Sequence, residues 1–191
     1  QSKFPGVGSI VLHGAADAGC LTTQAFSNPD HGAAGLELLR RGATAAETLA
    51  ILLRNDDSLA QRQIAVLGLD GPPAAHTGHA VKGWPGWAGY TTAPNSVAHG
   101  NGLRNERVAA EMADAFETSS GEIASRLIGA LHAGEAAGGE LRGLQSAAVL
   151  VVKPGGGYGG RTGRHVDISV YDHAEPIREL ERCYGLHRLS Y

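Results

Sequence analysis

Pairs of helices alternate with pairs of strands along this chain, and this order constrains the fold more than any single motif. A Thr-rich apolar run at 19–26 predicts a buried strand. A helix is expected at 32–41, where two arginines and Gly42 end it, and the capping box Thr44 to Glu47 starts a second helix at once. The strand is therefore followed by a helix pair.

The rest of the chain continues this alternation. Asp70-Gly71-Pro72 predicts a tight turn that joins strands at 63–69 and 74–77 into a hairpin. The other expected elements are a loop at 82–95, a short strand at 96–99, helices capped near Asn105 and starting near Ser120, a hairpin of 146–153 with 165–170, and a helix from Pro176. Antiparallel hairpins covered by helix pairs predict a layered α/β sandwich and argue against a doubly wound parallel sheet.

Composition narrows the classes of protein and of partner. The 191 residues make one ordinary domain, and 42% hydrophobic with 18% charged residues indicate a globular chain. A net charge of −3 without a basic cluster argues against nucleic acid and anionic membranes as partners. No apolar run reaches the roughly 18 residues that a membrane span requires.

The two cysteines, Cys20 and Cys183, lie within apolar patterns. We expect two buried free thiols, which indicates a cytoplasmic protein, with a single disulfide as the alternative. A thiol in an apolar run is usually inert, so Cys20 is interpreted as a core residue rather than as a nucleophile.

Two motifs resemble a dinucleotide-binding site and a metal site, and the sequence context of each argues against that function. The glycine run 155–160 contains G-x-G-x-x-G after a strand, but 161–164 leads into another strand instead of the helix that a dinucleotide site needs. We therefore expect a hairpin turn there. His76 and His79 flank a glycine at a strand end, with no further ligand at suitable spacing, which favours a turn over a metal site. No cofactor and no metal are predicted.

An aromatic group stands in the Gly/Pro-rich loop at 82–95, where Trp84, Trp87 and Tyr90 occur together. These side chains could wall a pocket, form an interface or simply pack over the sheet. Together with the apolar surplus of the chain, they lead us to expect a symmetric homo-oligomer, with a dimer as its simplest form.

Three polar segments stand out against their apolar surroundings. Lys3 precedes a Pro-Gly loop, Thr22-Thr23-Gln24 ends a strand, and the Gly-rich segment 135–146 enters the most apolar strand. Each also has an ordinary structural explanation: a helix cap, a side chain whose charged end reaches solvent, or a buried amide with its hydrogen bonds made within the protein.

These segments resemble those of a mostly bacterial and archaeal family, domain of unknown function 1028, described as Ntn-hydrolase-like. The matching phrases are Ser2-Lys3-Phe4 with Val7-Gly8, Thr23-Gln24-Ala25 with Asn28, Gly32, Gly35 and Leu36, Arg62-Gln63, His76-Thr77-Gly78, Trp87-Ala88-Gly89, Gly100-Asn101, the long segment 134–148, the run 155–160, and Asp172-His173 with Pro176. The resemblance covers essentially the whole chain. It implies the four-layer αββα sandwich of N-terminal-nucleophile hydrolases, which agrees with the element order.

The resemblance also implies a reaction class, the hydrolysis of amide (C–N) bonds in a small-molecule or peptide-like ligand. The residues that it marks as catalytic are Lys3 and Thr23, and those that it marks as substrate-binding are Ser2, Gln24, Asn101 and Gln145. Lys3 would lower the pKa of a nucleophile or hold a substrate carboxylate, and Asn101 would meet an oxyanion. We expect Lys3 to be partly buried near Thr23, with Gln24 among its partners.

Two departures from the family pattern bear on catalysis. His99 stands where the family usually has Gln before Gly-Asn. Members also begin with further residues, about two strands' worth, that commonly open Met-Thr-Phe-Ser, whereas Gln1-Ser2-Lys3 reads as the end of a strand. A terminal Thr could use its own α-amine as a base, and Gln1 has no nucleophile. We therefore expect a single domain, 1–191, that lacks its first strands, with a non-catalytic oligomeric or ligand-binding protein as the alternative.

Overall fold

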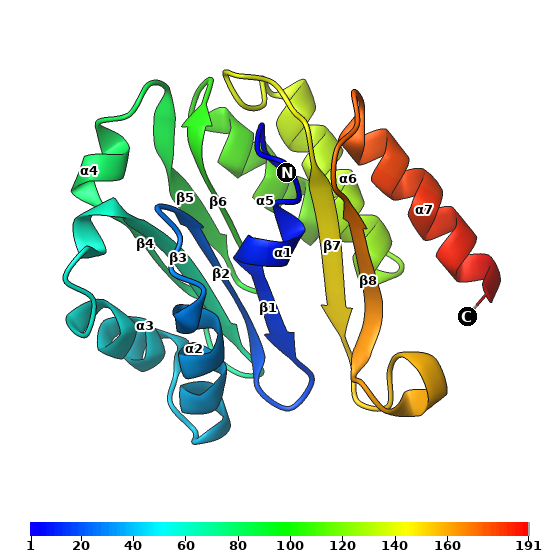
Figure 1. Ribbon diagram of the computed structural model, residues 1–191, viewed down its shortest axis with the longest axis horizontal. Coiled ribbons are helices and arrows are strands. Elements are labelled where there is room, and N and C mark those ends of the chain that lie inside the picture. The colour runs from blue at the N-terminus through cyan, green and yellow to red at the C-terminus, as the bar shows by residue number, and fades with distance from the viewer. Residues whose placement is uncertain (191) are drawn as a thin grey trace.

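A four-stranded antiparallel sheet forms the first half of the computed structural model, which describes residues 1–190 (Figure 1). Its strands, in spatial order, are β1 (Leu12–Ala15), β2 (Gly19–Ala25), β3 (Arg62–Gly68) and β4 (Ala74–Thr77). Two further antiparallel pairs follow, β5 (Trp87–Ala93) with β6 (Ser96–Leu103) and β7 (Ala147–Val152) with β8 (Arg164–Val170). The chain is thus a mixed α/β protein with antiparallel sheets.

The two predicted helix pairs lie between these strand groups, and two four-residue helices that were not predicted occur in addition. The helices are α1 (Gly8–Val11), α2 (Asp30–Arg40), α3 (Ala45–Arg54), α4 (His79–Lys82), α5 (Arg107–Thr118), α6 (Ile123–Ala136) and α7 (Pro176–Ser190), with 3-10 turns at Leu59–Gln61 and Tyr158–Gly160. The capping box of α3 is confirmed, because Thr44 and Glu47 exchange side-chain and backbone hydrogen bonds. Among residues 1–190, every helix is too short or too polar to cross a lipid bilayer.

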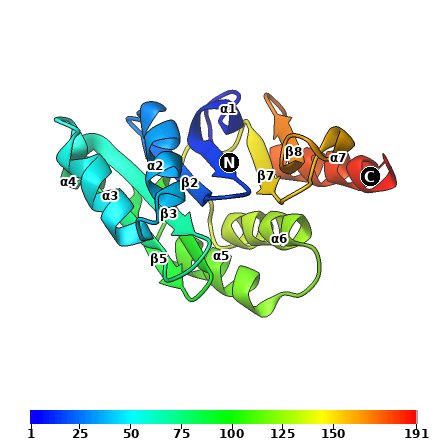
Figure 2. The ribbon, with the colours of Figure 1, turned by 90° about the horizontal axis from the view of Figure 1, so that it is seen from below.

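Strand alternation gives the first sheet two different faces. On β2, Leu21 points toward α2 and α3, where it packs near Gly35 and Leu52. The next residue, Thr22, points to the opposite face, as does Gln24. Helices α2 and α3 therefore cover one face of this sheet, and its other face meets the second half of the chain (Figure 2).

The second half packs its own helices on the far side of the two hairpins. Ala98 of β6 contacts Ala109 and Ala113 of α5 within one small core. A larger core joins β7 and β8 to α6 and α7 through side chains such as Ile128, Val149 and Leu180. The opposite face of β7 lies against β1, because a Cβ on Gly14 would sit 3.2 Å from the side chain of Val152. Fully burying one such aliphatic side chain stabilises the fold by about 1.5–3 kcal/mol.

The two hairpins are separate, so each has an unpaired edge. Within residues 1–190, β6 pairs only with β5 and β7 only with β8. Short bridges mark the ends of these edges: Ser2 pairs with Ser146 just before β7, and Leu103 of β6 pairs with Glu140. The start of the chain therefore lies between the end of β6 and the beginning of β7.

Two sequence-based expectations about this half are wrong in their extents. Residues 87–93 form β5 where a loop over 82–95 was expected, because aromatic and Thr side chains favour the strand although glycine and proline precede it. β6 runs on from 99 to Leu103 through Gly100-Asn101-Gly102.

The cysteines are both free, but the expectation that both are buried is wrong. Cys20 is exposed and Cys183 is half-buried. Cys20 pairs with Gly14 and Leu67 across the sheet, on the face that points away from α2, so the helices do not cover it.

Candidate functional site

A group of polar side chains joins the first sheet to the β5–β6 hairpin. We call it the inter-sheet cluster; it consists of Thr22, Gln24, Gln63, His99 and Asn101. Gln63, on β3, is completely buried at its centre. Its Nε2 donates to Thr77 Oγ1 at 3.0 Å and to the carbonyls of Gly89 (3.2 Å) and Gly100 (2.8 Å). One side chain thereby ties β3, β4, β5 and β6 together.

The other end of Gln63 organises two of the predicted binding residues. Its Oε1 accepts from Gln24 Nε2 at 2.8 Å and from Asn101 Nδ2 at 3.0 Å. Both amides are half-buried, and each turns its donor inward to Gln63. Since an amide also carries an acceptor oxygen with two lone pairs, Gln24 and Asn101 each retain an acceptor to offer to another molecule.

Thr22 and His99 form the closest contact of the cluster. Thr22 Oγ1 and His99 Nε2 are 2.6 Å apart. Burial lowers the pKa of His99 to about 4, so the imidazole is neutral at pH 7. Its Nδ1 is buried and has no hydrogen-bond partner among the described residues. The ring therefore holds Thr22 with one nitrogen and leaves the other unsatisfied.

Ser2 and Gln145 lie together at the start of β7. The Gln145 backbone amide donates to the Ser2 carbonyl at 2.9 Å, beside the Ser2–Ser146 bridge. The buried Glu140 carboxylate accepts from Ser2 Oγ at 3.3 Å and from the Lys3 backbone amide at 3.0 Å. Because Glu140 also pairs with Leu103, this group adjoins the end of β6 that carries Asn101.

The expectation that Lys3 is partly buried with Gln24 among its partners is wrong. The Lys3 side chain is exposed and has no hydrogen bond or ion pair within residues 1–190. Thr23 is fully buried on the α2 face, where its Oγ1 accepts from the backbone amide of Asn28 at 3.3 Å. Thr23 therefore closes the turn into α2, while its neighbour Thr22 points into the inter-sheet cluster.

The comparison with protein families agrees with the resemblance seen in the sequence. Residues 1–180 match the model of a family of unknown function, DUF1028. The chain belongs to this family. A crystal structure of protein SPO2555 from Silicibacter pomeroyi, assigned to DUF1028, is 32% identical to the chain, with a TM-score of 0.86 over 97% of this chain and 76% of that one. No curated protein matches the chain.

This DUF1028 chain has a second buried polar group, on the helix-covered face of the first sheet. It consists of His31, Asp56 and Arg62, which we call the ionic cluster. Asp56 accepts from Arg62 Nε at 2.7 Å and from His31 Nε2 at 3.0 Å. The Arg62 guanidinium holds the pKa of Asp56 below its usual range, whereas burial lowers the pKa of His31.

Sequence reasoning named Gln24 and Asn101, which the fold brings together, but it assigned no role to Gln63, Thr22 or His99. A signal for Gln63 was available, because it and Arg62 are the two polar residues of an otherwise apolar strand. No three of the described His, Cys, Asp and Glu side chains lie together in a way that could hold a metal ion.

Proposed function

We propose that this DUF1028 member binds an amide-bearing small molecule or short peptide at the inter-sheet cluster. The observation that carries the proposal is the pair of half-buried amides, Gln24 and Asn101, whose donors are held by Gln63 and whose acceptors are spare. Covering such an acceptor without a hydrogen bond costs about 1–3 kcal/mol, so a ligand that donates to it is favoured over one that only covers it. Amide groups both donate and accept, which matches His99, Gln24 and Asn101.

Amide-bond hydrolysis is the second candidate, and the 2.6 Å contact between Thr22 and His99 favours it, since a hydroxyl beside an imidazole is the arrangement of a nucleophile with its base. A base whose pKa is about 4 accepts protons poorly at pH 7. The Lys3 side chain forms no hydrogen bond with a cluster residue among residues 1–190, and Thr23 Oγ1 bonds on the opposite face of β2. We therefore place binding ahead of catalysis.

We also propose that the architecture is the four-layer αββα sandwich of N-terminal-nucleophile hydrolases. Its support is the sequence of packing contacts, from α2 and α3 through the first sheet to the hairpins, and then to α5, α6 and α7. The unpaired edges of β6 and β7 have room for the additional strands that each sheet of such a sandwich can hold.

The test uses N-acetyl amino-acid amides and dipeptides as probes, with binding followed by saturation-transfer NMR and calorimetry. We expect Asn101→Ala to weaken binding about fivefold, the effect of one lost hydrogen bond. The matched control is Asn95→Ala on the same hairpin, because Asn95 is exposed and bonds only to Glu117 among the described residues. Absence of binding, or equal effects of the two variants, would reject the site.

The same samples separate binding from hydrolysis. Release of free amine from a bound probe, abolished by Thr22→Val while binding persists, would establish the hydrolase. Binding without release supports the binding function alone.

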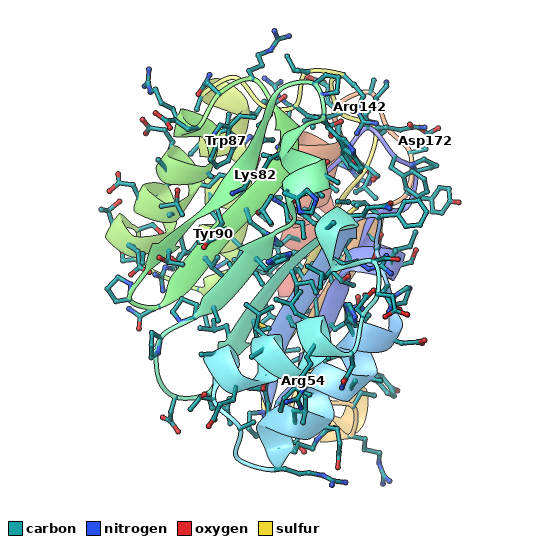
Figure 3. The ribbon with its side chains drawn as sticks, turned by 90° about the vertical axis from the view of Figure 1, so that its left-hand side faces the viewer. Arg54, Lys82, Trp87, Tyr90, Arg142 and Asp172 are labelled. Atoms are coloured by element: carbon teal, nitrogen blue, oxygen red, sulfur yellow. The ribbon has the colours of Figure 1, made fainter. Side chains whose placement is uncertain are left out.

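We propose that the chain forms a homodimer whose interface contains the exposed aromatic side chains at and just before β5. Tyr90 is 45% exposed and Trp84 39% exposed, and Figure 3 shows Trp87 and Tyr90 along this strand. Sedimentation should detect a dimer that Tyr90→Glu dissociates. A wild-type chain that remains monomeric at micromolar concentration would contradict this proposal.

A further inference from the structure

A hollow of about 460 Å³ lies at the edge of the molecule that carries the β1–β2 and β7–β8 turns. Figure 1 shows these two turns side by side at its lower edge, whereas the start of the chain lies near its upper edge. The hollow is therefore remote from the group around Ser2. Arginines from two segments line it: Arg40 at the end of α2, and Arg161 and Arg164 where the glycine-rich turn enters β8.

The charges around this hollow do not cancel. Arg40 pairs with Asp17 at 2.9 Å, and Arg164 pairs with Asp167. Arg161 is exposed and has no ion pair or side-chain hydrogen bond among the described residues. Asp17 is the only acidic residue among the lining residues, against three arginines. Arg40 also lies 3.9 Å from Glu37, so the excess positive charge of the lining is that of Arg161.

The positive field extends beyond the turn. The pKa of His13 on β1 is lowered, mainly by burial. The hydrogen bond to the Ile10 carbonyl raises this pKa, and the positive charge of Arg164 lowers it further. An anion in the hollow would reduce this unfavourable interaction.

The backbone of the glycine-rich turn supplies further hydrogen-bond donors. Gly155, Gly160 and Gly163 line the hollow with φ of +70°, +69° and +68°, a left-handed conformation that favours glycine. Backbone of this kind directs successive amide groups into a concavity that suits an anion. The amides of Arg161 and Thr162 donate to no protein acceptor within residues 1–190.

We infer that this hollow binds the phosphate group of a small molecule through Arg161, Arg164 and the amides of the glycine-rich turn. A tetrahedral phosphate presents oxygens in several directions, so it can accept from two guanidinium groups and from backbone amides at once. The mode differs from a dinucleotide fingerprint, because the turn leads into β8 and no helix N-terminus takes part. This site is independent of ligand binding at the inter-sheet cluster.

The test is a titration of the folded protein with inorganic phosphate at constant ionic strength, followed by the amide NMR signals of 155–163. We expect saturable shifts that Arg161→Gln weakens about tenfold, the effect of one lost charged hydrogen bond. The control is Arg54→Gln on α3, since Arg54 is also an exposed arginine without an ion pair among the described residues (Figure 3). Arg54→Gln should leave the titration unchanged.

Three results would overturn the inference. The first is the absence of saturation below about 10 mM phosphate, and the second is equal weakening by the two arginine variants. The third is an equal response to acetate, which would make the hollow a carboxylate site. A phosphate response that exceeds the acetate response and depends on Arg161 supports the phosphate assignment.

Discussion

Adjacent residues of β3 belong to the two buried polar clusters of this protein, and the clusters differ in charge and in exposure. Arg62 points to the helix-covered face and enters the ionic cluster with His31 and Asp56. Gln63 points to the other face and organises the neutral inter-sheet cluster. On the α2 side of the strand the polar contact is made by the charged Arg62, and on the β5–β6 side it is made by the amide of Gln63.

The ionic cluster is more deeply buried than the inter-sheet cluster, although His31 lines a surface hollow between α2 and α3. His31, Asp56 and Arg62 are 5%, 7% and 9% exposed, and both Asp56 oxygens accept from Arg62. In the inter-sheet cluster only Gln63 is buried, and the other four residues are half-buried. We conclude that the first serves the fold, whereas the second has the access and spare acceptors that ligand binding requires.

The largest effect is expected from the ionic cluster. Asp56→Ala leaves the Arg62 charge buried without its partner, so the free energy of unfolding should fall by about 3–5 kcal/mol. Urea denaturation measures this, with Asp57→Ala at the neighbouring exposed site as the control. A loss for Asp56→Ala no greater than that of the control would show that the cluster contributes little to the fold.

A smaller loss is expected from the inter-sheet cluster. Gln63→Leu keeps the volume but removes the partners of Gln24, Asn101 and two backbone carbonyls, which should cost about 2–3 kcal/mol. Gln61→Leu, at an exposed position, is the control. If Gln63→Leu proves neutral, the cluster does not hold the sheets together, and the contrast with the ionic cluster becomes sharper.

A pH-dependent difference should follow from His99. Burial lowers its folded pKa from 6.5 to about 4, so the unfolded chain binds the proton first as the pH falls. The corresponding stability is complete above pH 6.5 and is lost between pH 6.5 and about 4. His99→Gln should remove about 1–2 kcal/mol of this decline.

Denaturation at several pH values measures this effect, and His79→Gln, at an exposed position, serves as the control. An unchanged decline in His99→Gln would place its origin elsewhere, for instance in the buried His31.

The smallest effect is expected at Lys3. Its side chain is exposed and unpartnered within residues 1–190, so Lys3→Met should change stability by less than about 0.5 kcal/mol and leave probe binding unchanged. A marked loss of probe binding or amine release would return Lys3 to the site that the family resemblance implied.

The sequence determined the local elements through short-range chemistry. The capping box at Thr44, the turn at Asp70-Gly71-Pro72 and the hairpin around the glycine run 155–160 are all present. Each signal lies within a few residues of the structure that it specifies. β5 was missed because Pro85, Gly86 and Gly89 mask a strand whose stability comes from pairing with β6.

The tertiary structure alone decided which polar residues meet. Thr22 and Thr23 are alternating residues on one strand, and only the packing of α2 determines which of them is covered. Gln24 and Asn101, far apart in the chain, meet because Gln63 from a third segment binds both. Strand alternation is a local property, but the identity of each face is not, because distant elements must pack before one side becomes the core and the other a site.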